Sequence, residues 1–208
     1  PNIPKSVELR PYQKEAIRNW EYKNYRGIFD MATGTGKTFT GLAAAVHLYE
    51  KLGQHMALII VVPYQHLVMQ WVEDVEEFGF DPIIGFSTSP QKNWEKALRE
   101  KAMYYKFSKK KPNHLCFITT NATFSLPRIQ EVLTRLEENV LLIVDEAHNV
   151  GSEKLQKKLL PQANYRLGLS ATITRHGDEQ GTEALLRYFG DVVFTYTLEQ
   201  AIQSNMLT

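Results

Sequence analysis

Cysteine is nearly absent from this sequence, since its 208 residues include only Cys116. A single cysteine excludes a disulfide within the chain and a zinc site built on several cysteines. Cys116 stands within an apolar stretch, residues 114–118, which predicts a buried structural thiol rather than a reactive one. A thiol of this kind suits a reducing compartment, and we expect the protein in one.

Long apolar runs and an excess of charge of one sign are also missing. No uninterrupted apolar segment is long enough to span a bilayer and no signal-peptide pattern opens the chain, so we expect no membrane partner. The net charge is +1, from 24 Lys and Arg against 23 Asp and Glu, so any nucleic-acid binding would depend on a local patch. The chain begins at Pro1 without an initiator Met, and we expect a fragment of a longer protein.

Residues 27–40 hold the pattern on which the interpretation depends: a short apolar run, a glycine-rich turn and an apolar run with helical spacing. Glycines allow successive backbone N–H groups to converge on an anion, and the helix that begins at Lys37 adds the positive end of its dipole. The sequence therefore predicts a phosphate-binding loop in which Lys37 reaches the outer phosphates and the Thr38 hydroxyl binds Mg²⁺. Met31 stands where the pattern G-x-x-x-x-G-K-[ST] has its first glycine, and an ordinary strand–helix turn is the alternative.

Strand-like and helix-like segments alternate along the rest of the chain. Continuous apolar runs such as residues 57–62 and 140–144 predict strands buried on both faces. Segments with helical spacing predict helices, for example over residues 124–136 and 154–160. The alternation predicts an α/β fold, a mostly parallel sheet sandwiched between helices, in one domain over residues 1–208. In such a sheet ligands bind beyond the carboxyl ends of the strands.

Asp145 and Glu146 directly follow the strand predicted at residues 140–144. Nucleotide hydrolysis needs a carboxylate that holds Mg²⁺ and a second group that orients the attacking water. Adjacent carboxylates at a strand end can divide these roles, with Asp145 on the metal and Glu146 on the water. Alternatively the two residues cap the next helix. The Lys37 loop in the same predicted sheet favours the catalytic interpretation, with Lys37, Asp145 and Glu146 as catalytic residues.

Polar residues follow other predicted strands as well. No second histidine or cysteine stands beside His148 at ligand spacing, so we expect a hydrogen-bonded residue near the phosphates and not a metal ligand. Ser170 and Thr172 follow the strand predicted at residues 165–169. On their own they are hydroxyls that could form only turn hydrogen bonds. Their position at the same sheet edge places them beside the predicted phosphate loop.

Residues 106–111 carry four lysines beside aromatic residues. Such a cluster is more often a solvated loop, and contact with nucleic-acid phosphates is the alternative. Trp71 and Trp94 fit the inward faces of predicted helices, so we predict core positions for both.

In this order, the motifs resemble those of the first motor domain of superfamily-two helicases and translocases, over nearly the whole chain. Residues 9–13 resemble the Q-motif, in which Gln13 would read the adenine edge with Arg10 nearby. Residues 32–38 resemble motif I, which often lacks the first glycine in this superfamily. Residues 145–148, Asp-Glu-Ala-His, match motif II, the DEAH box.

Three further segments complete the resemblance. Residues 62–71 resemble motif Ia and residues 119–121 motif Ic, both of which touch the nucleic-acid backbone in the family, while residues 170–172 match motif III, which couples hydrolysis to movement. The resemblance implies nucleotide binding by Arg10, Gln13, Thr33, Gly34, Thr35, Gly36, Lys37 and Thr38, metal binding by Thr38 and Asp145, coupling by His148, Ser170 and Thr172, and nucleic-acid contacts from Pro63, Gln65, Thr119 and Thr120.

Within the superfamily, residues 9–13 and 167–172 look most like the XPB-like repair helicases and the motor subunits of restriction enzymes. Many of those continue after motif III with Arg-Glu-Asp, of which only Arg175 is kept here. The resemblance implies a RecA-like P-loop fold, with ATP and Mg²⁺ as cofactors. It also implies DNA as the partner of an ATP-dependent helicase or translocase, in the cytoplasm, nucleoid or nucleus.

Two other functions stay open beside the DNA motor. One is an ATP-dependent RNA helicase, because RNA and DNA motors both carry the DEAH tetrapeptide. The other is a binding module that uses ATP only as a switch, which the intact Lys37, Asp145 and Glu146 disfavour. The family's second RecA-like domain, which supplies the other wall of the ATP cleft, is absent from the sequence. We therefore expect weak ATP binding, very slow hydrolysis and no unwinding by this segment alone.

Overall fold

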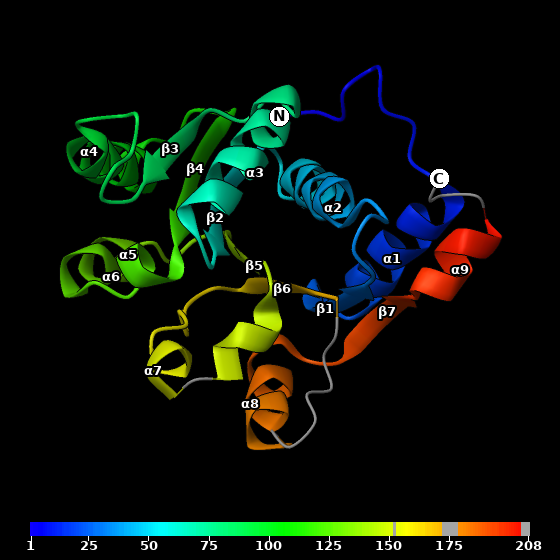
Figure 1. Ribbon diagram of the computed structural model, residues 1–208. Coiled ribbons are helices and arrows are strands. Elements are labelled where there is room, and N and C mark those ends of the chain that lie inside the picture. The colour runs from blue at the N-terminus through cyan, green and yellow to red at the C-terminus, as the bar shows by residue number, and fades with distance from the viewer. Residues whose placement is uncertain (152, 172–178, 205–208) are drawn as a thin grey trace.

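The computed structural model describes residues 1–151, 153–171 and 179–204 (Figure 1). Seven strands form one sheet in the order β3-β4-β2-β5-β6-β1-β7, and all neighbouring strands run parallel. This confirms the predicted α/β fold with a parallel sheet. The strands are β1 (Arg26–Met31), β2 (His55–Val62), β3 (Pro82–Gly85), β4 (Asn113–Thr120), β5 (Val140–Val144), β6 (Tyr165–Ser170) and β7 (Val192–Tyr196).

Helices cover both faces of this sheet, and each face has its own apolar core (Figure 1). Helices α1, α2, α3 and α9 contribute to one core, while α4 to α8 and the 3₁₀ helix η1 contribute to the other. The helices are α1 (Pro11–Tyr22), α2 (Lys37–Lys51), α3 (Gln65–Glu77), α4 (Trp94–Phe107), α5 (Asn121–Phe124), α6 (Pro127–Thr134), η1 (Ala147–Gly151), α7 (Glu153–Gln156), α8 (Glu179–Phe189) and α9 (Leu198–Gln203).

Strand β2 shows why the central strands are apolar throughout. All of its residues are buried. Leu58, Ile60 and Val62 belong to the core with α2 and α3, whereas Ile59 and Val61 belong to the core on the opposite face. Successive side chains of a strand point to opposite faces, so a strand covered on both faces needs apolar residues at every position.

Two predicted helices are shorter than the sequence suggested. The helix predicted over residues 124–136 is wrong as a single element, because α5 ends at Phe124 and α6 begins at Pro127. Proline lacks a backbone N–H and disfavours helical conformation in the residue before it, so it starts a helix here rather than continuing one. The helix predicted over residues 154–160 ends at Gln156, where α7 gives way to turns.

The sheet order brings three motif-bearing strand ends together. Strand β6 lies between β5 and β1, so the segments that follow these three strands share one edge of the sheet. Strands β2 and β4 are neighbours on the other side of β5. Among the described residues, no helix is long and apolar enough to cross a membrane.

Candidate nucleotide-binding site

The predicted phosphate loop connects β1 to α2, as the sequence pattern requires. Gly34 and Gly36 have φ angles of +85° and +80°, a conformation that glycine adopts without steric cost. The Thr35 side chain is buried, and its Oγ1 donates to the Ala32 carbonyl at 2.6 Å. Thr33 and Gly34 are exposed at the tip of the loop. The loop is therefore anchored from within while its tip remains open to a ligand.

The start of α1 packs against this loop. Gln13 is buried, its Nε2 donates to Thr40 Oγ1 at 2.9 Å, and its Oε1 accepts the Arg10 N–H at 2.9 Å. The Tyr12 hydroxyl donates to the Thr35 carbonyl. A Cβ added at Gly36 would lie 3.2 Å from Gln13 Nε2, so this glycine also permits the close approach of α1. The Q-motif segment thus holds the loop, a role of Tyr12 that the sequence did not reveal.

Lys37 contacts both predicted catalytic carboxylates. Its Nζ lies 2.9 Å from Glu146 Oε1 and 3.2 Å from Asp145 Oδ1. Burial on its own lowers the pKa of an ammonium, but attraction to Asp145 and Glu146 outweighs it, so the pKa of Lys37 is raised. Residues more than 100 positions apart in the sequence therefore meet as one ion cluster, the arrangement that their strand positions predicted.

Backbone and side-chain groups orient the two carboxylates. Asp145 Oδ1 accepts the Glu146 N–H at 2.8 Å, and Asp145 Oδ2 accepts the Trp71 indole N–H at 2.9 Å. Glu146 has a φ angle of +50°, which is uncommon for a residue other than glycine. Trp71 is buried, as predicted, but its hydrogen bond to Asp145 was not foreseen.

His148 and Ser170 lie beside this cluster. His148 Nδ1 is 3.0 Å from Ser170 Oγ, and His148 Nε2 is 3.4 Å from Glu146 Oε2. These contacts join the segment after β5 to the end of β6. Thr172 and Arg175 lie outside the described residues.

The residues predicted to touch nucleic acid lie at the ends of β2 and β4. Gln65 is exposed and links α3 to the segment after β3, since its amide contacts Ser87 Oγ at 3.2 Å and Thr88 Oγ1 at 2.9 Å. Pro63 is half-buried just before it.

The hydroxyls of Thr119 and Thr120 are both used inside the fold. Thr119 Oγ1 donates to the Gly85 carbonyl at 2.6 Å, and Thr120 Oγ1 accepts the Thr123 N–H at 3.2 Å as the cap of α5. Both side chains are buried. Ser87 and Thr88 are exposed at this edge, although no sequence motif indicated them.

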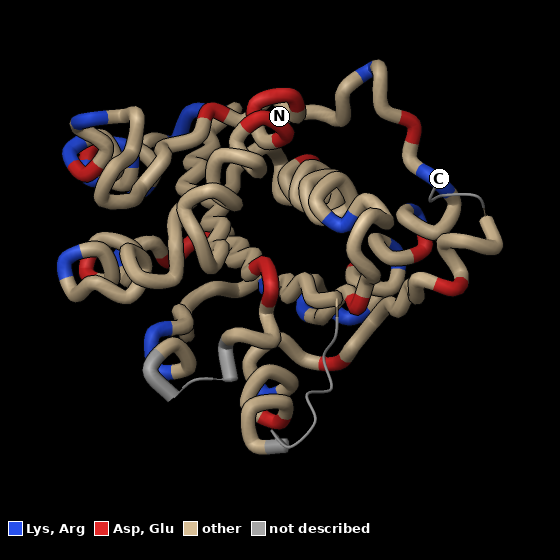
Figure 2. Tube along the Cα trace, viewed as in Figure 1, with Lys and Arg blue, Asp and Glu red and all other residues tan. Residues whose placement is uncertain are grey.

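The lysine cluster lies at the opposite edge of the sheet. Lys109 and Lys111 line a small hollow with His55, and His55 pairs in register with Asn113 at the first residues of β2 and β4. The phosphate loop follows the last residue of β1, so the two features mark opposite ends of parallel strands. Figure 2 shows that charges of both signs are distributed along the chain. This placement favours a solvated loop.

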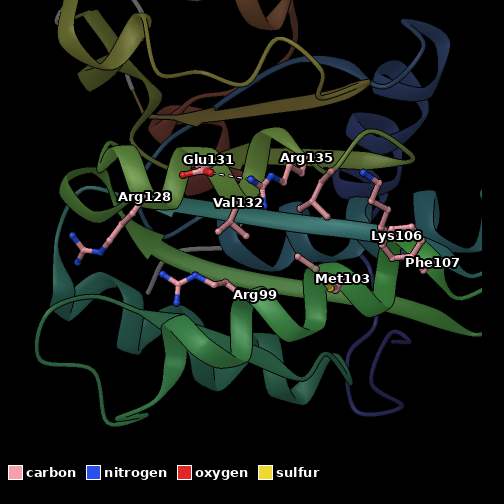
Figure 3. Close-up of a pocket in the computed structure, with 10 residues that line it drawn as sticks. Arg99, Met103, Lys106, Phe107, Arg128, Glu131, Val132 and Arg135 are labelled. Carbon is pink, nitrogen blue, oxygen red and sulfur yellow. Dashed lines mark hydrogen bonds and ion pairs between the residues drawn. The ribbon is translucent and has the colours of Figure 1, made fainter.

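A groove of about 450 Å³ runs between α4 and α6 on the sheet face opposite α2 and α3. Arg99 and Met103 of α4 and Arg128 and Val132 of α6 line it (Figure 3). Among the described residues, those that line the groove include Lys106 of the lysine cluster but no residue predicted to bind nucleotide or metal. The groove is therefore separate from the Lys37 cluster.

A metal site with several protein ligands would need His, Cys, Asp or Glu side chains close together in the described ranges. No three His, Cys, Asp or Glu side chains gather there into a metal-binding group. Mg²⁺ commonly keeps several waters and uses one or two protein oxygens, so Asp145 and Thr38 would suffice for it.

A family model described as "Type III restriction enzyme, res subunit" matches residues 6–175. The chain belongs to this family. The match covers the phosphate loop, the Asp145-Glu146 pair and Ser170 together, and it confirms a superfamily-two first motor domain close to the restriction-enzyme branch. Membership in this helicase and translocase family implies ATP hydrolysis.

Several individual proteins resemble this chain, one in sequence and others in fold. The DNA 3'-5' translocase XPB2 of Sulfurisphaera tokodaii is 30% identical over 204 residues, which are 96% of this chain and 38% of that protein. A nuclease-deletion mutant of the Type ISP restriction-modification enzyme LlaGI, in complex with a DNA substrate mimic, gives a TM-score of 0.72 at 20% identity, over 96% of this chain and 21% of that one. The helicase domain of Hef from Pyrococcus furiosus gives 0.64 at 18% identity, over 90% and 38%. The solved structures confirm the RecA-like fold.

Proposed function

We propose that this domain is the nucleotide-binding half of an ATP-dependent DNA helicase or translocase, which couples ATP hydrolysis to movement on DNA or its unwinding. The observation that carries the proposal is the ion cluster of Lys37 with Asp145 and Glu146. A lysine at the start of a helix after a glycine-rich loop, paired with two carboxylates at the end of another strand of the same parallel sheet, is the arrangement that phosphoryl transfer requires.

The phosphates would bind at the loop and the start of α2. Backbone N–H groups of the loop would surround a bound anion, and Lys37 would exchange its carboxylate partners for phosphate oxygens. For adenine recognition, Gln13 keeps one free donor position and one free acceptor position, because its amide uses only one of each internally. Arg10 is exposed beside it.

Mg²⁺ would be held by the Thr38 hydroxyl and the Asp145 carboxylate. Hard oxygen ligands suit this ion, and the carboxylates already hold one positive charge in the form of the Lys37 ammonium. When bound, the ion supplies charge stabilisation for the transferred phosphoryl group. Glu146 would orient the attacking water, and its contact with His148 connects it to Ser170. On this basis we propose coupling roles for His148 and Ser170, and the resemblance to motif III extends the proposal to Thr172, which lies outside the described residues.

DNA is the favoured partner because the named relative is a DNA translocase and the LlaGI structure holds a DNA substrate mimic. We propose that it contacts the segment from Pro63 to Gln65 and the segment at Thr119 and Thr120. Since both threonine hydroxyls are used internally, backbone groups would serve there. An RNA helicase is the alternative. Competition between RNA and duplex DNA for stimulation of the ATPase distinguishes the two, and stimulation by RNA alone would overturn the DNA assignment.

The chain spans 38% of the length of the XPB2 relative, so a second RecA-like domain of the same protein would complete the cleft. An arginine finger from such a domain is worth about 10³–10⁵ in rate where it has been measured. We therefore propose that these 208 residues alone hydrolyse ATP very slowly.

The site is tested in the full-length protein by Lys37→Ala and Glu146→Gln. Each should lower DNA-stimulated phosphate release by about 10²-fold or more, because one removes the phosphate cation and the other the group that orients water. Lys51→Ala is the matched control, since Lys51 ends the same helix and is exposed. Wild-type turnover in either site variant would refute the assignment.

A further inference from the structure

Trp71, on helix α3, is hydrogen-bonded to Asp145, the carboxylate predicted to bind the metal ion. The indole Nε1 donates to Asp145 Oδ2 at 2.9 Å, and the two residues are only 2% and 5% exposed. A tryptophan in an apolar core needs no acidic partner, and its N–H could be satisfied by a backbone carbonyl. Trp20 shows that case, since its buried Nε1 donates to the Arg166 carbonyl at 3.0 Å.

The hydrogen bond from Trp71 goes to Asp145 Oδ2, whereas the other contacts of this carboxylate are made by Oδ1. Asp145 Oδ1 takes the Glu146 N–H and lies near Lys37, whereas the bond to Oδ2 comes from α3. The terminal torsion of an aspartate is soft, so a donor on each oxygen fixes the plane of the carboxylate. A hydrogen bond to an ionised acceptor in a buried setting is also stronger than one between neutral groups.

The indole itself is held in place by packing. It lies on the buried face of α3, and a Cβ added at Gly41 of α2 would come 3.8 Å from its Cη2 atom. Tryptophan has only two side-chain torsions, so an indole packed between α2 and the end of β5 is a rigid donor. Helix α3 begins at Gln65, about 9 Å along the helix axis from Trp71.

We propose that Trp71 is a positioning residue that orients the Asp145 carboxylate for the metal ion of the bound nucleotide. It acts from α3, the helix that begins at the predicted nucleic-acid segment. This inference rests on the proposed function, because it takes Asp145 to be the metal carboxylate. Partners that orient metal-binding carboxylates have effects on metal affinity of about 10- to 100-fold when they are lost.

The test measures ADP binding by the full-length protein at a series of Mg²⁺ concentrations, by titration calorimetry and without turnover. Trp71→Phe keeps an aromatic ring and removes the N–H, and it should raise the Mg²⁺ midpoint by about 10- to 100-fold. Trp20→Phe is the matched control, because it also removes a buried indole hydrogen bond. It should lower the melting temperature and leave the Mg²⁺ midpoint unchanged, a separation that a merely structural role of Trp71 would not produce.

A second variant covers the case in which Trp71→Phe does not fold. Replacement of Trp71 by 3-benzothienylalanine keeps the bicyclic shape and exchanges the N–H for sulfur, and it should raise the Mg²⁺ midpoint in the same way. A wild-type midpoint in either folded variant would overturn the inference and leave the proposed function intact. A wild-type protein that binds no ADP at any Mg²⁺ concentration would instead overturn the proposed function, and the inference with it.

Discussion

Lys37→Met should destabilise the nucleotide-free protein, because it leaves two neighbouring carboxylates without their cation. The side chains of Lys37 and Asp145 are 12% and 6% exposed, and that of Glu146 is 28% exposed. Removing one partner of a buried ion pair costs about 3–5 kcal/mol. Asp145 keeps its hydrogen bonds from Trp71 and from the Glu146 backbone, and Glu146 reaches water, so we expect about 2–3 kcal/mol here.

Thermal unfolding of the wild type and the variant measures this loss. For a domain of this size, 1 kcal/mol changes Tm by about 2–4 °C, so Tm should fall by about 4–12 °C at pH 7. The double variant Lys37→Met/Asp145→Asn should regain part of the loss. An unchanged Tm at pH 7, or a double variant that is no more stable than Lys37→Met, would refute this account of the cluster.

Two further predictions concern the half-buried His114 and the phosphate-loop residue Gly36. Burial, with help from Lys101, lowers the pKa of His114 to about 4, and its neutral Nε2 accepts the Asp81 N–H at 3.4 Å. The stability that the neutral His114 ring contributes is therefore fully present above pH 6.5, near the pKa of histidine in the unfolded chain, and is lost as the pH falls toward 4. After allowance for the partial exposure of the ring, this loss is about 1–2 kcal/mol. The free energy of unfolding of His114→Gln, measured with urea, should depend less on pH between pH 7 and pH 4 than that of the wild type. An equal pH dependence in the two proteins would contradict this. Gly36→Ala should cost about 1–2 kcal/mol because φ is +80°, and should weaken nucleotide binding because its Cβ meets Gln13. Gly53→Ala, at a φ of +69° away from the site, should share the first effect without the second; equal nucleotide affinities of the two variants would contradict the role of the loop.

Local sequence patterns were sufficient for the elements that place the site. The apolar run at residues 140–144 became β5, and the two glycines of the phosphate loop adopt the positive φ angles that such a loop uses. Because parallel strands end at a common edge, two strand assignments placed Lys37, after β1, at the same edge as Asp145 and Glu146, after β5, and the structure shows them in contact. These features depend on neighbours in the sequence and on one topological rule.

Of the contacts that the sequence did not reveal, two join distant segments and a third is local. Trp71 reads as a core residue by its helical spacing, and nothing near it in the sequence indicates a bond to Asp145. Gln13 resembles an adenine-reading residue, but its position under Thr40 depends on how α1 packs on α2. Thr120 became a helix cap, which follows from where α5 begins, and no pattern at the threonine itself distinguishes a cap from a nucleic-acid contact.

The charges of the site also bear on how a nucleotide would enter it. One ammonium faces two carboxylates, so the cluster of Lys37, Asp145 and Glu146 is already net negative before any phosphate arrives. A triphosphate without its metal ion would compete with these carboxylates for Lys37 and would leave them unpaired and largely buried, which is unfavourable. A metal ion bound with the nucleotide would replace the Lys37 ammonium as the positive charge beside the carboxylates. Lys37 would then be available to the phosphates. The same pairing that stabilises the nucleotide-free site therefore makes nucleotide binding and metal binding depend on each other, and the bond from Trp71 acts on the residue at which the two meet.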